Sequence, residues 1–311
     1  MVRPAFLGLP SPSRIAEPNF WPVCMGTTTR TRLATRDLHV EDFDLKHTLE
    51  CGQIFRQVYV HGWYYVHACD RLFKIRQAAP DTVQYAGNVD DDFLNRFFRL
   101  DEDLSGIVAA MGKDRHMAAA IEHAKGLRLI RQDSWECLVS YICSQASHIR
   151  KIRKNVEGLS EAFGEPVYLE NRASYAFPAP GAMDDLGKIR AARTGYRAQY
   201  LYAANRSVDR KALQRISAMP YAAAKEALME LEGVGHKVAD CVLLFGLGFL
   251  NAFPVDVWVK RAVQTCYFDG LERSCAQVRE FGQAHFGQYA GYAQQYLFYY
   301  WRTHHLRESG A

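Results

Sequence analysis

The sequence has no run of apolar residues close to the about 20 that a transmembrane helix needs. Its eight cysteines include no pair with the two-residue gap that is typical of a zinc or redox site. Cys266 and Cys275 have no third and fourth partner nearby, which argues against an iron–sulfur cluster. No internal repeat with a period of about 20 to 50 residues is present. These absences predict a protein without a membrane span, a catalytic metal or a cofactor, with reduced and mostly buried cysteines.

The composition that remains is that of an ordinary globular protein, with 311 residues of which 49% are hydrophobic and 23% charged. This length corresponds to about two domains. The charge is uneven along the chain: residues 1–112 have 12 basic and 14 acidic side chains, whereas the remainder has 26 basic and 20 acidic ones. The positive excess in the C-terminal two-thirds favours a polyanionic partner, and phosphate is the usual one.

The N-terminal part of the chain divides into two segments. Residues 1–36 contain five prolines, five arginines and one acidic residue, which predicts a flexible extension. A start at Met25 or an organelle transit peptide are the alternatives for this segment. Residues 37–112 contain short β-branched and aromatic runs between turn residues, followed by a helix from residue 91. We therefore expect a small antiparallel β domain there.

From about residue 106 onward the hydrophobic spacing is helical. The predicted helices cover residues 136–143, 148–163, 196–205, 221–231, 237–246, 257–266 and 276–302. The predicted class is α+β, with the β domain in front of a larger helical domain at residues 113–305 and a short tail at 306–311.

The most informative stretch is a glycine hairpin between two predicted helices. Gly233 and Gly235 flank Val234, and a new helix starts directly after them. Glycine permits positive φ and close approach of the backbone, and the free amides at a helix start favour an anion. Residues 222–247 therefore predict a helix–hairpin–helix that holds a DNA phosphate without recognising base sequence. The alternative is a glycine-capped turn between packed helices.

Two charged residues near this hairpin suggest chemistry. Lys237 lies in the first turn of the second helix, where the helix dipole disfavours a cation. A neutral amine there is a nucleophile, whereas a charged one is a second phosphate contact. Asp256 follows Pro254 and fits the N-cap of the next helix. Beyond capping, its carboxylate can stabilise a developing cation or move a proton, so the pair suggests attack on a sugar–base bond.

The sequence resembles the helix–hairpin–helix DNA glycosylases that have a catalytic lysine. The resemblance is carried by residues 233–237, which end in Lys237, and by residues 254–256. Three further stretches narrow the resemblance to the 8-oxoguanine DNA glycosylases, in their bacterial type. These are residues 50–56, 127–144 and 289–298, and the resemblance covers about residues 37–302.

The resemblance implies a monomeric base-excision-repair enzyme whose partner is double-stranded DNA containing 8-oxoguanine. The enzyme bends the duplex and flips the oxidised guanine into a pocket. Lys237 attacks C1′ and displaces the base, Asp256 stabilises the cationic sugar, and β-elimination then nicks the abasic site. In a bacterium this activity belongs to the cytoplasmic nucleoid, and in a eukaryote to the nucleus or mitochondria.

The resemblance also assigns residues to the base pocket. The Gly52 carbonyl accepts the N7–H that 8-oxoguanine has and guanine lacks. Phe298 stacks on the base, and Gln294 contacts its Watson–Crick edge. Cys241 faces the other side of the base as a charge-polarised pair with the lysine, and Pro254 lines the pocket. Taken singly, Gly52 is equally a turn glycine, Cys241 a buried small side chain, and the two helix residues packing groups.

On the side of the opposite strand, Tyr196 resembles the wedge inserted at the flipped site, and Arg197 a contact to the orphaned cytosine. The chain departs from the family pattern at three positions. Ala146 stands where an asparagine recognises that cytosine, Lys151 replaces a neighbouring arginine, and Trp258 replaces the histidine of animal members. Arg197 is then the main remaining contact to the opposite base.

Two other functions stay open at this stage. One is a glycosylase of the same fold for another damaged base, although members that remove alkylated bases usually lack the lysine. The other is a protein that binds lesions without turnover.

Overall fold

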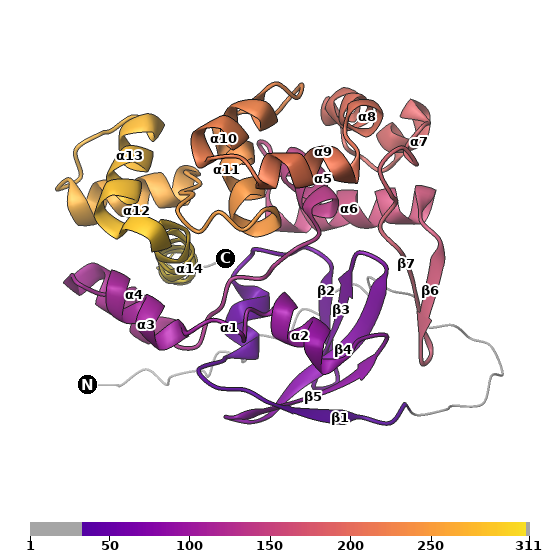
Figure 1. The fold of residues 1–311 in the computed structure, drawn as a ribbon, viewed down its shortest axis with the longest axis horizontal. Helices are drawn as coiled ribbons and strands as arrows, with labels where there is room; N and C mark the ends of the chain where they lie inside the picture. Colours follow the sequence, from indigo (N-terminus) through magenta and orange to yellow (C-terminus); the bar gives the residue numbers. More distant parts are fainter. Residues whose placement is uncertain (1–32, 309–311) are drawn as a thin grey trace, which may run out of the picture.

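The computed structural model describes residues 33–308, as an antiparallel sheet beneath a layer of helices (Figure 1). The expectations for residues 1–32, including a start at Met25, lie outside the described residues. The α+β class is confirmed: a β region comes first along the chain, and helices dominate after it.

The sheet has five antiparallel strands in the order β1-β5-β4-β3-β2. His61 and Gly62 form the tight turn between β2 and β3, and both have positive φ. β1 is a short and largely exposed edge strand without the β-branched and aromatic residues that indicate the other four strands in the sequence. The strands are β1 (Arg36–His39), β2 (Gln57–Val60), β3 (Trp63–Ala68), β4 (Arg71–Ala79) and β5 (Thr82–Gly87).

Two helices, α1 (Leu45–Glu50) and α2 (Asp91–Phe97), bury apolar residues against this sheet. The sheet core includes Phe73, Tyr85 and Phe98. From Leu104 onward, the buried residues of α3 belong to the helical core instead. The packing therefore changes from one core to the other between α2 and α3.

Eight helices begin after an aspartate whose carboxylate accepts a hydrogen bond from an amide of the first turn, which explains why these helices start where they do. The helices of the larger region are α3 (Leu104–Met111), α4 (Arg115–His123), α5 (Ser134–Cys143), α6 (Ile149–Phe163), α7 (Leu186–Ala191), α8 (Arg197–Ser207), α9 (Arg210–Ser217), α10 (Tyr221–Met229), α11 (His236–Cys241), the π-helical turn η1 (Val242–Gly246), α12 (Val257–Tyr267), α13 (Cys275–Phe286), the 3₁₀ turn η2 (Gly287–Tyr289) and α14 (Ala290–Glu308).

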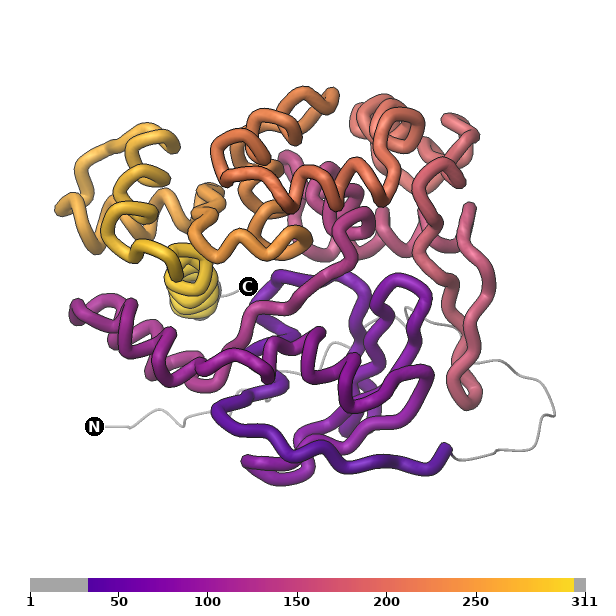
Figure 2. Tube along the Cα trace, in the orientation of Figure 1, coloured from indigo at the N-terminus to yellow at the C-terminus, as the bar shows by residue number. Residues whose placement is uncertain are grey.

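The structure has four helices in this region that are not among the predicted ones, α3, α4, α7 and α9, and the helix predicted at 237–246 ends in the π-helical turn η1. It departs from the prediction in two further places. A hairpin of β6 (Pro166–Leu169) and β7 (Arg172–Tyr175) interrupts the helical region and descends beside the sheet (Figures 1 and 2). It forms because Leu169 packs into a sheet cluster and Glu170 pairs with Lys74 at 2.6 Å. The helix predicted at 276–302 is broken at Gly287, whose φ of +60° ends α13.

The last helix, α14, packs against both α4 and α12 and is seen end-on in Figures 1 and 2. It continues through Glu308, into the segment expected to be a tail. Its position between the N-terminal helices and the hairpin region lets it contribute side chains to a site that both regions share.

Candidate active site and DNA interface

The glycine hairpin lies between α10 and α11. Gly233 has a φ of +79°, and a β-carbon there would overlap the ring of Tyr200, so both the backbone and the packing require glycine. Val234 is buried, whereas Gly235 and His236 are exposed. No side chain caps α11, which leaves the first amides of this helix for an acceptor from outside. The hairpin has the features of a phosphate site.

Lys237 extends from the first turn of α11 to the end of α5. Its Nζ donates a hydrogen bond to Ser144 Oγ at 2.7 Å, and Ser144 donates in turn to the Tyr141 carbonyl at 2.7 Å. The same Nζ lies 5.1 Å from the centre of the Tyr141 ring. The end of α5 therefore fixes the position of the amine.

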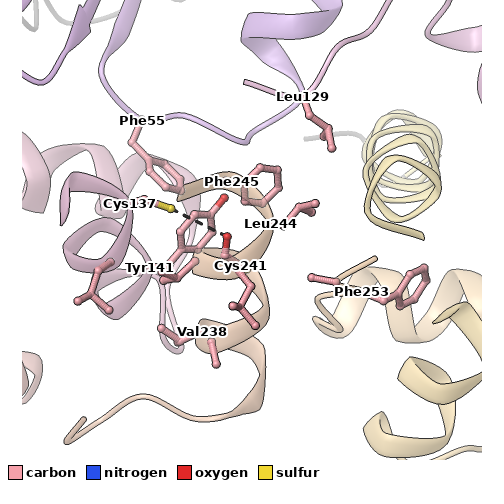
Figure 3. Packing of buried hydrophobic residues seen from close by; sticks show 14 of the residues in the cluster. Phe55, Leu129, Cys137, Tyr141, Val238, Cys241, Leu244, Phe245 and Phe253 are labelled. Carbon is pink, nitrogen blue, oxygen red and sulfur yellow. Dashed lines mark hydrogen bonds between the residues drawn. The ribbon is translucent and has the colours of Figure 1, made fainter. Parts of the chain in front are cut away.

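The ring of Tyr141 is itself held in place by aromatic packing. It stacks on Phe245 at a centroid distance of 5.6 Å and meets Phe55 edge-on at 5.7 Å (Figure 3). Its hydroxyl donates to the Gln53 carbonyl at 3.2 Å. Tyr141 thus contacts both the lysine and the loop that contains Gly52.

Asp256 is the N-cap of α12, as the sequence predicts, and accepts from the Val259 amide at 2.8 Å. Burial raises the pKa of this carboxyl, against the opposing effects of two amide hydrogen bonds and the charges of Lys237 and Arg302. Lys237 and Asp256 form no ion pair with each other. The two groups therefore interact through space across the site.

Cys241 follows Lys237 by one turn and is 3% exposed. Burial raises the pKa of its thiol to about 12, although the charge of Lys237 acts in the opposite direction. Its carbonyl lies 4.0 Å from the sulfur of Cys137 (Figure 3). Burial thus favours the neutral thiol over the thiolate that a charge-polarised pair requires.

The carbonyl of Gly52 lies between two carbonyls that accept hydrogen bonds from side chains. Gln295 donates to the Cys51 carbonyl at 3.2 Å, and Gln132 donates to the Gln53 carbonyl at 2.7 Å. The Gly52 carbonyl between them accepts no hydrogen bond from the described residues. Gly52 has a φ of +94°, a conformation that favours glycine.

Helix α14 carries a row of side chains four residues apart. Gln294 is 5% exposed, and its Oε1 has no hydrogen-bond partner within residues 33–308. Phe298 is half-buried, and the guanidinium of Arg302 lies 5.0 Å from the centre of its ring. A β-carbon on Gly52 would lie 2.5 Å from Arg302 Nη1, so the loop and the helix meet there. We call Gly52, Gln294, Phe298 and Arg302 the candidate base pocket; Pro254 is buried in the segment that leads to Asp256.

A second group of predicted residues lies around the end of α5 and the start of α8. Tyr196 is 56% exposed, and its ring lies 4.5 Å from the guanidinium carbon of Arg197. Arg197 is 2% exposed and donates to the carbonyls of three residues in the adjoining loops. Ala146 is exposed with a φ of +42°, and Lys151 is exposed in the first turn of α6. We call Ala146, Lys151, Tyr196 and Arg197 the opposite-strand face.

The structure brings together more residues than the sequence reasoning named as site residues. Ser144 and Tyr141 lie within the stretch 127–144 that carries the family resemblance, and in the structure they contact the amine of Lys237. Arg302 was missed, although its spacing of four and eight residues from Phe298 and Gln294 places all three on one face of a helix. Gln145 was also missed; its side chain donates to the Gly233 carbonyl at 2.9 Å and ties the opposite-strand face to the hairpin.

Among residues 33–308, no helix is long and apolar enough to cross a membrane. The same residues include no group of three or more histidine, cysteine or acidic side chains arranged to hold a metal ion.

Comparisons with known proteins identify the family of the chain. Residues 37–138 match the family profile described as "8-oxoguanine DNA glycosylase, N-terminal domain". The chain is 28% identical over 309 residues to a probable N-glycosylase/DNA lyase of Methanothermobacter thermautotrophicus, covering 87% of this chain and 96% of the relative.

Two solved structures are also similar over most of their length. One is MBOgg1 in complex with a low affinity DNA ligand, with a TM-score of 0.83, 33% identity, and coverage of 92% of this chain and 99% of that chain. The other is the Clostridium acetobutylicum 8-oxoguanine glycosylase/lyase in complex with double-stranded DNA containing cytosine opposite 8-oxoguanine, with a TM-score of 0.81, 29% identity, and coverage of 88% and 98%. The chain belongs to the 8-oxoguanine DNA glycosylase/lyase family of the helix–hairpin–helix superfamily.

Proposed function

We propose that this chain excises 8-oxoguanine from double-stranded DNA and then cleaves the abasic site, with Lys237 as the nucleophile. It is an N-glycosylase/DNA lyase of base-excision repair. The observation that carries the assignment of Lys237 is the position of its amine, at the start of an uncapped helix and hydrogen-bonded to Ser144 Oγ at 2.7 Å. A DNA phosphate bound to the hairpin would bring the sugar of a flipped nucleotide towards this amine.

The first step is displacement of the base. The amine of Lys237, once deprotonated, forms a bond to C1′ while the C1′–N9 bond breaks and its electron pair leaves with the base, which takes up a proton. Asp256, as the carboxylate, stabilises positive charge that develops on the sugar. Ser144 orients the amine through the hydrogen bond that it accepts.

The second step is cleavage of the strand. Opening of the sugar ring gives an imine between C1′ and the Lys237 nitrogen. Loss of a proton from C2′ then expels the 3′ phosphate with the electron pair of the C3′–O bond. Asp256 is the acidic group next to the sugar that the site supplies for moving protons in these steps.

Recognition of the base is assigned to the candidate base pocket. The free Gly52 carbonyl accepts the N7–H of 8-oxoguanine, and guanine would leave it unpaired because its N7 has no proton. The unpartnered Gln294 Oε1 is an acceptor for the N–H groups on the Watson–Crick edge. Phe298 stacks on one face of the base, Cys241 faces the other, and Pro254 closes the pocket beside them.

Contacts to the rest of the duplex are assigned to the exposed residues. The backbone of Gly233, Val234 and Gly235 holds a phosphate, and Tyr196 enters the gap left by the flipped base. The exposed Lys151 contacts the opposite strand, and the buried Arg197, which donates to backbone carbonyls, holds the loop of Ala146 that faces this strand. We further propose that the enzyme acts as a monomer, because one chain supplies every group named above, and that it is located wherever the cell keeps its DNA.

Borohydride trapping tests the nucleophile. A duplex with 8-oxoguanine opposite cytosine is mixed with the protein and borohydride, which reduces the imine to a stable amine. We expect a covalent protein–DNA band that is lost by at least about a hundredfold in Lys237→Gln. Lys113→Gln, which removes an exposed lysine before α4, is the matched control and keeps the band.

The same experiment separates the rival functions. Tight lesion binding without a band in the wild type would overturn the lyase and leave a lesion-binding protein. A band only with duplexes that carry another damaged base would overturn 8-oxoguanine as the substrate. A band that survives Lys237→Gln would assign the nucleophile elsewhere.

A further inference from the structure

Arg302 has a buried hydrogen-bond donor that no group among residues 33–308 satisfies. Its Nη2 donates to the Glu50 carbonyl at 2.8 Å, and its guanidinium lies over the ring of Phe298. Its Nη1, in contrast, is buried and has no hydrogen-bond partner. Because leaving a buried N–H of a charged group unpaired costs free energy, this donor points to a ligand that is absent from the free protein.

The location of Nη1 indicates which part of a ligand it meets. A β-carbon on Gly52 would lie 2.5 Å from Nη1, so the glycine leaves room for the guanidinium beside the loop. The Gly52 carbonyl is the group assigned above to the N7–H of the flipped base. The C8 oxygen of 8-oxoguanine is attached to the carbon bonded to N7, and it is therefore the acceptor nearest to a donor beside Gly52.

From this geometry we propose that Arg302 is a specificity-determining residue whose Nη1 donates a hydrogen bond to the C8 oxygen of the flipped 8-oxoguanine. The inference rests on the proposed function and deepens it. Guanine and 8-oxoguanine differ at two adjacent atoms, N7 and C8. The Gly52 carbonyl recognises the added hydrogen on N7, and Arg302 recognises the added oxygen on C8, so guanine leaves both protein groups unpaired.

The surroundings of Arg302 suit this role. Burial lowers the pKa of the guanidinium, and the acidic groups that face it, from Glu50 on α1 and Asp256 before α12, act in the opposite direction. A guanidinium is not deprotonated in proteins, and a charged donor forms a stronger hydrogen bond than a neutral one. Its guanidinium carbon lies 5.0 Å from the centre of the Phe298 ring, which holds the group beside the residue that is expected to stack on the base.

Equilibrium binding to modified duplexes tests the contact without requiring turnover. All measurements use the full chain with Lys237→Gln, which stops the reaction. The duplexes carry 8-oxoguanine, 8-oxoadenine, 8-thioguanine or a tetrahydrofuran abasic analogue. 8-Oxoadenine keeps the N7–H and the C8 oxygen but lacks the C6 oxygen, whereas 8-thioguanine replaces the C8 oxygen with sulfur, a poor acceptor.

We expect Arg302→Leu to weaken binding of 8-oxoguanine and of 8-oxoadenine by about tenfold to a hundredfold. Its effect on 8-thioguanine and on the abasic analogue is expected to be below about threefold. Arg302→Lys restores part of the affinity, since it keeps the charge without the planar fork. Arg96→Leu removes an exposed arginine from α2 and is the matched control for the loss of one positive charge.

Three results would overturn the inference. An equal loss on all four duplexes means that Arg302 supports the fold or the general DNA contact. A loss with 8-oxoguanine but none with 8-oxoadenine moves the contact to the C6 oxygen. No loss at all excludes the contact. Failure of the proposed function is distinguishable, because it appears as an absent borohydride band in the protein with Lys237 intact.

Discussion

The candidate base pocket and the opposite-strand face differ in how many polar groups they leave free. In the pocket, Gly52 O, Gln294 Oε1 and Arg302 Nη1 have no hydrogen-bond partner among the described residues. On the opposite-strand face, Arg197 directs its N–H groups to backbone carbonyls, and Ala146 has no polar side chain. Unpaired buried groups penalise a wrong ligand, whereas groups already satisfied do not. We therefore expect this chain to discriminate the damaged base more strictly than the base opposite.

The largest effect is expected from the buried ion network behind the hairpin, on the helix α11 that carries Lys237. Asp240 of α11 is fully buried and accepts from Tyr221 Oη at 2.7 Å, Lys225 Nζ at 2.9 Å and Arg279 Nε at 2.7 Å. Asp240→Asn leaves two buried cations without their carboxylate, and we expect the free energy of unfolding to fall by about 3–5 kcal/mol. Urea unfolding measures this loss. An unchanged midpoint would show that water reaches the network and compensates it.

Gly52→Ala is expected to weaken recognition of the damaged base in the candidate base pocket. The β-carbon would lie 2.5 Å from Arg302 Nη1, and alanine is strained at a φ of +94°. We expect 8-oxoguanine release under single-turnover conditions to slow by about a hundredfold, with cleavage of a preformed abasic site much less affected. In a double-mutant cycle with Arg302→Leu, the two losses should not add. Full additivity would mean that Gly52 does not act through Arg302.

The pH dependence of base release tests the role of Asp256, the carboxyl group proposed to lie next to the sugar. Burial raises the pKa of Asp256, and the proposed role requires its carboxylate. Base release should therefore fall as the pH drops through this raised pKa, by about tenfold per pH unit below it. Single-turnover rates of the wild type and Asp256→Asn, measured between about pH 4 and 8, check this. A limb of the same shape in the variant would assign it to another group.

Ala146→Asn, on the opposite-strand face, is expected to increase discrimination of the base opposite the lesion. This is the smallest of the expected effects. Asparagine tolerates the left-handed φ of +42° better than alanine does, so the substitution fits the backbone. Its amide adds a polar group that can contact an opposite cytosine. We expect the preference for cytosine over adenine opposite the lesion to rise by about tenfold in single-turnover assays. No change in preference would mean that the preference does not depend on a polar side chain at position 146.

The sequence predicts best those features that depend on local chemistry. Asp256 was correctly expected to cap a helix, because a carboxylate after Pro254 has few other local roles. The β6–β7 hairpin was missed because its stability comes from Glu170 and Leu169 meeting a distant sheet. The sequence could not predict that the N–H groups of Arg197 are directed to backbone carbonyls, or that Arg302 has an unpaired donor, for a similar reason. The Gln145 carbonyl lies 52 residues from Arg197, and Gly52 lies 250 residues from Arg302.

Tyr141 adds a consequence for the size of the bases that the enzyme accepts. Its hydroxyl bonds to the loop of Gly52, its ring lies under the amine of Lys237, and Phe55 and Phe245 prevent the ring from turning. The separation between the group assigned to the lesion and the group assigned to the attack is therefore set by a rigid aromatic spacer, and not by a loop that adjusts. A base that is too large or too small would enter the pocket but hold C1′ away from the amine. We therefore expect such a base to bind without being excised.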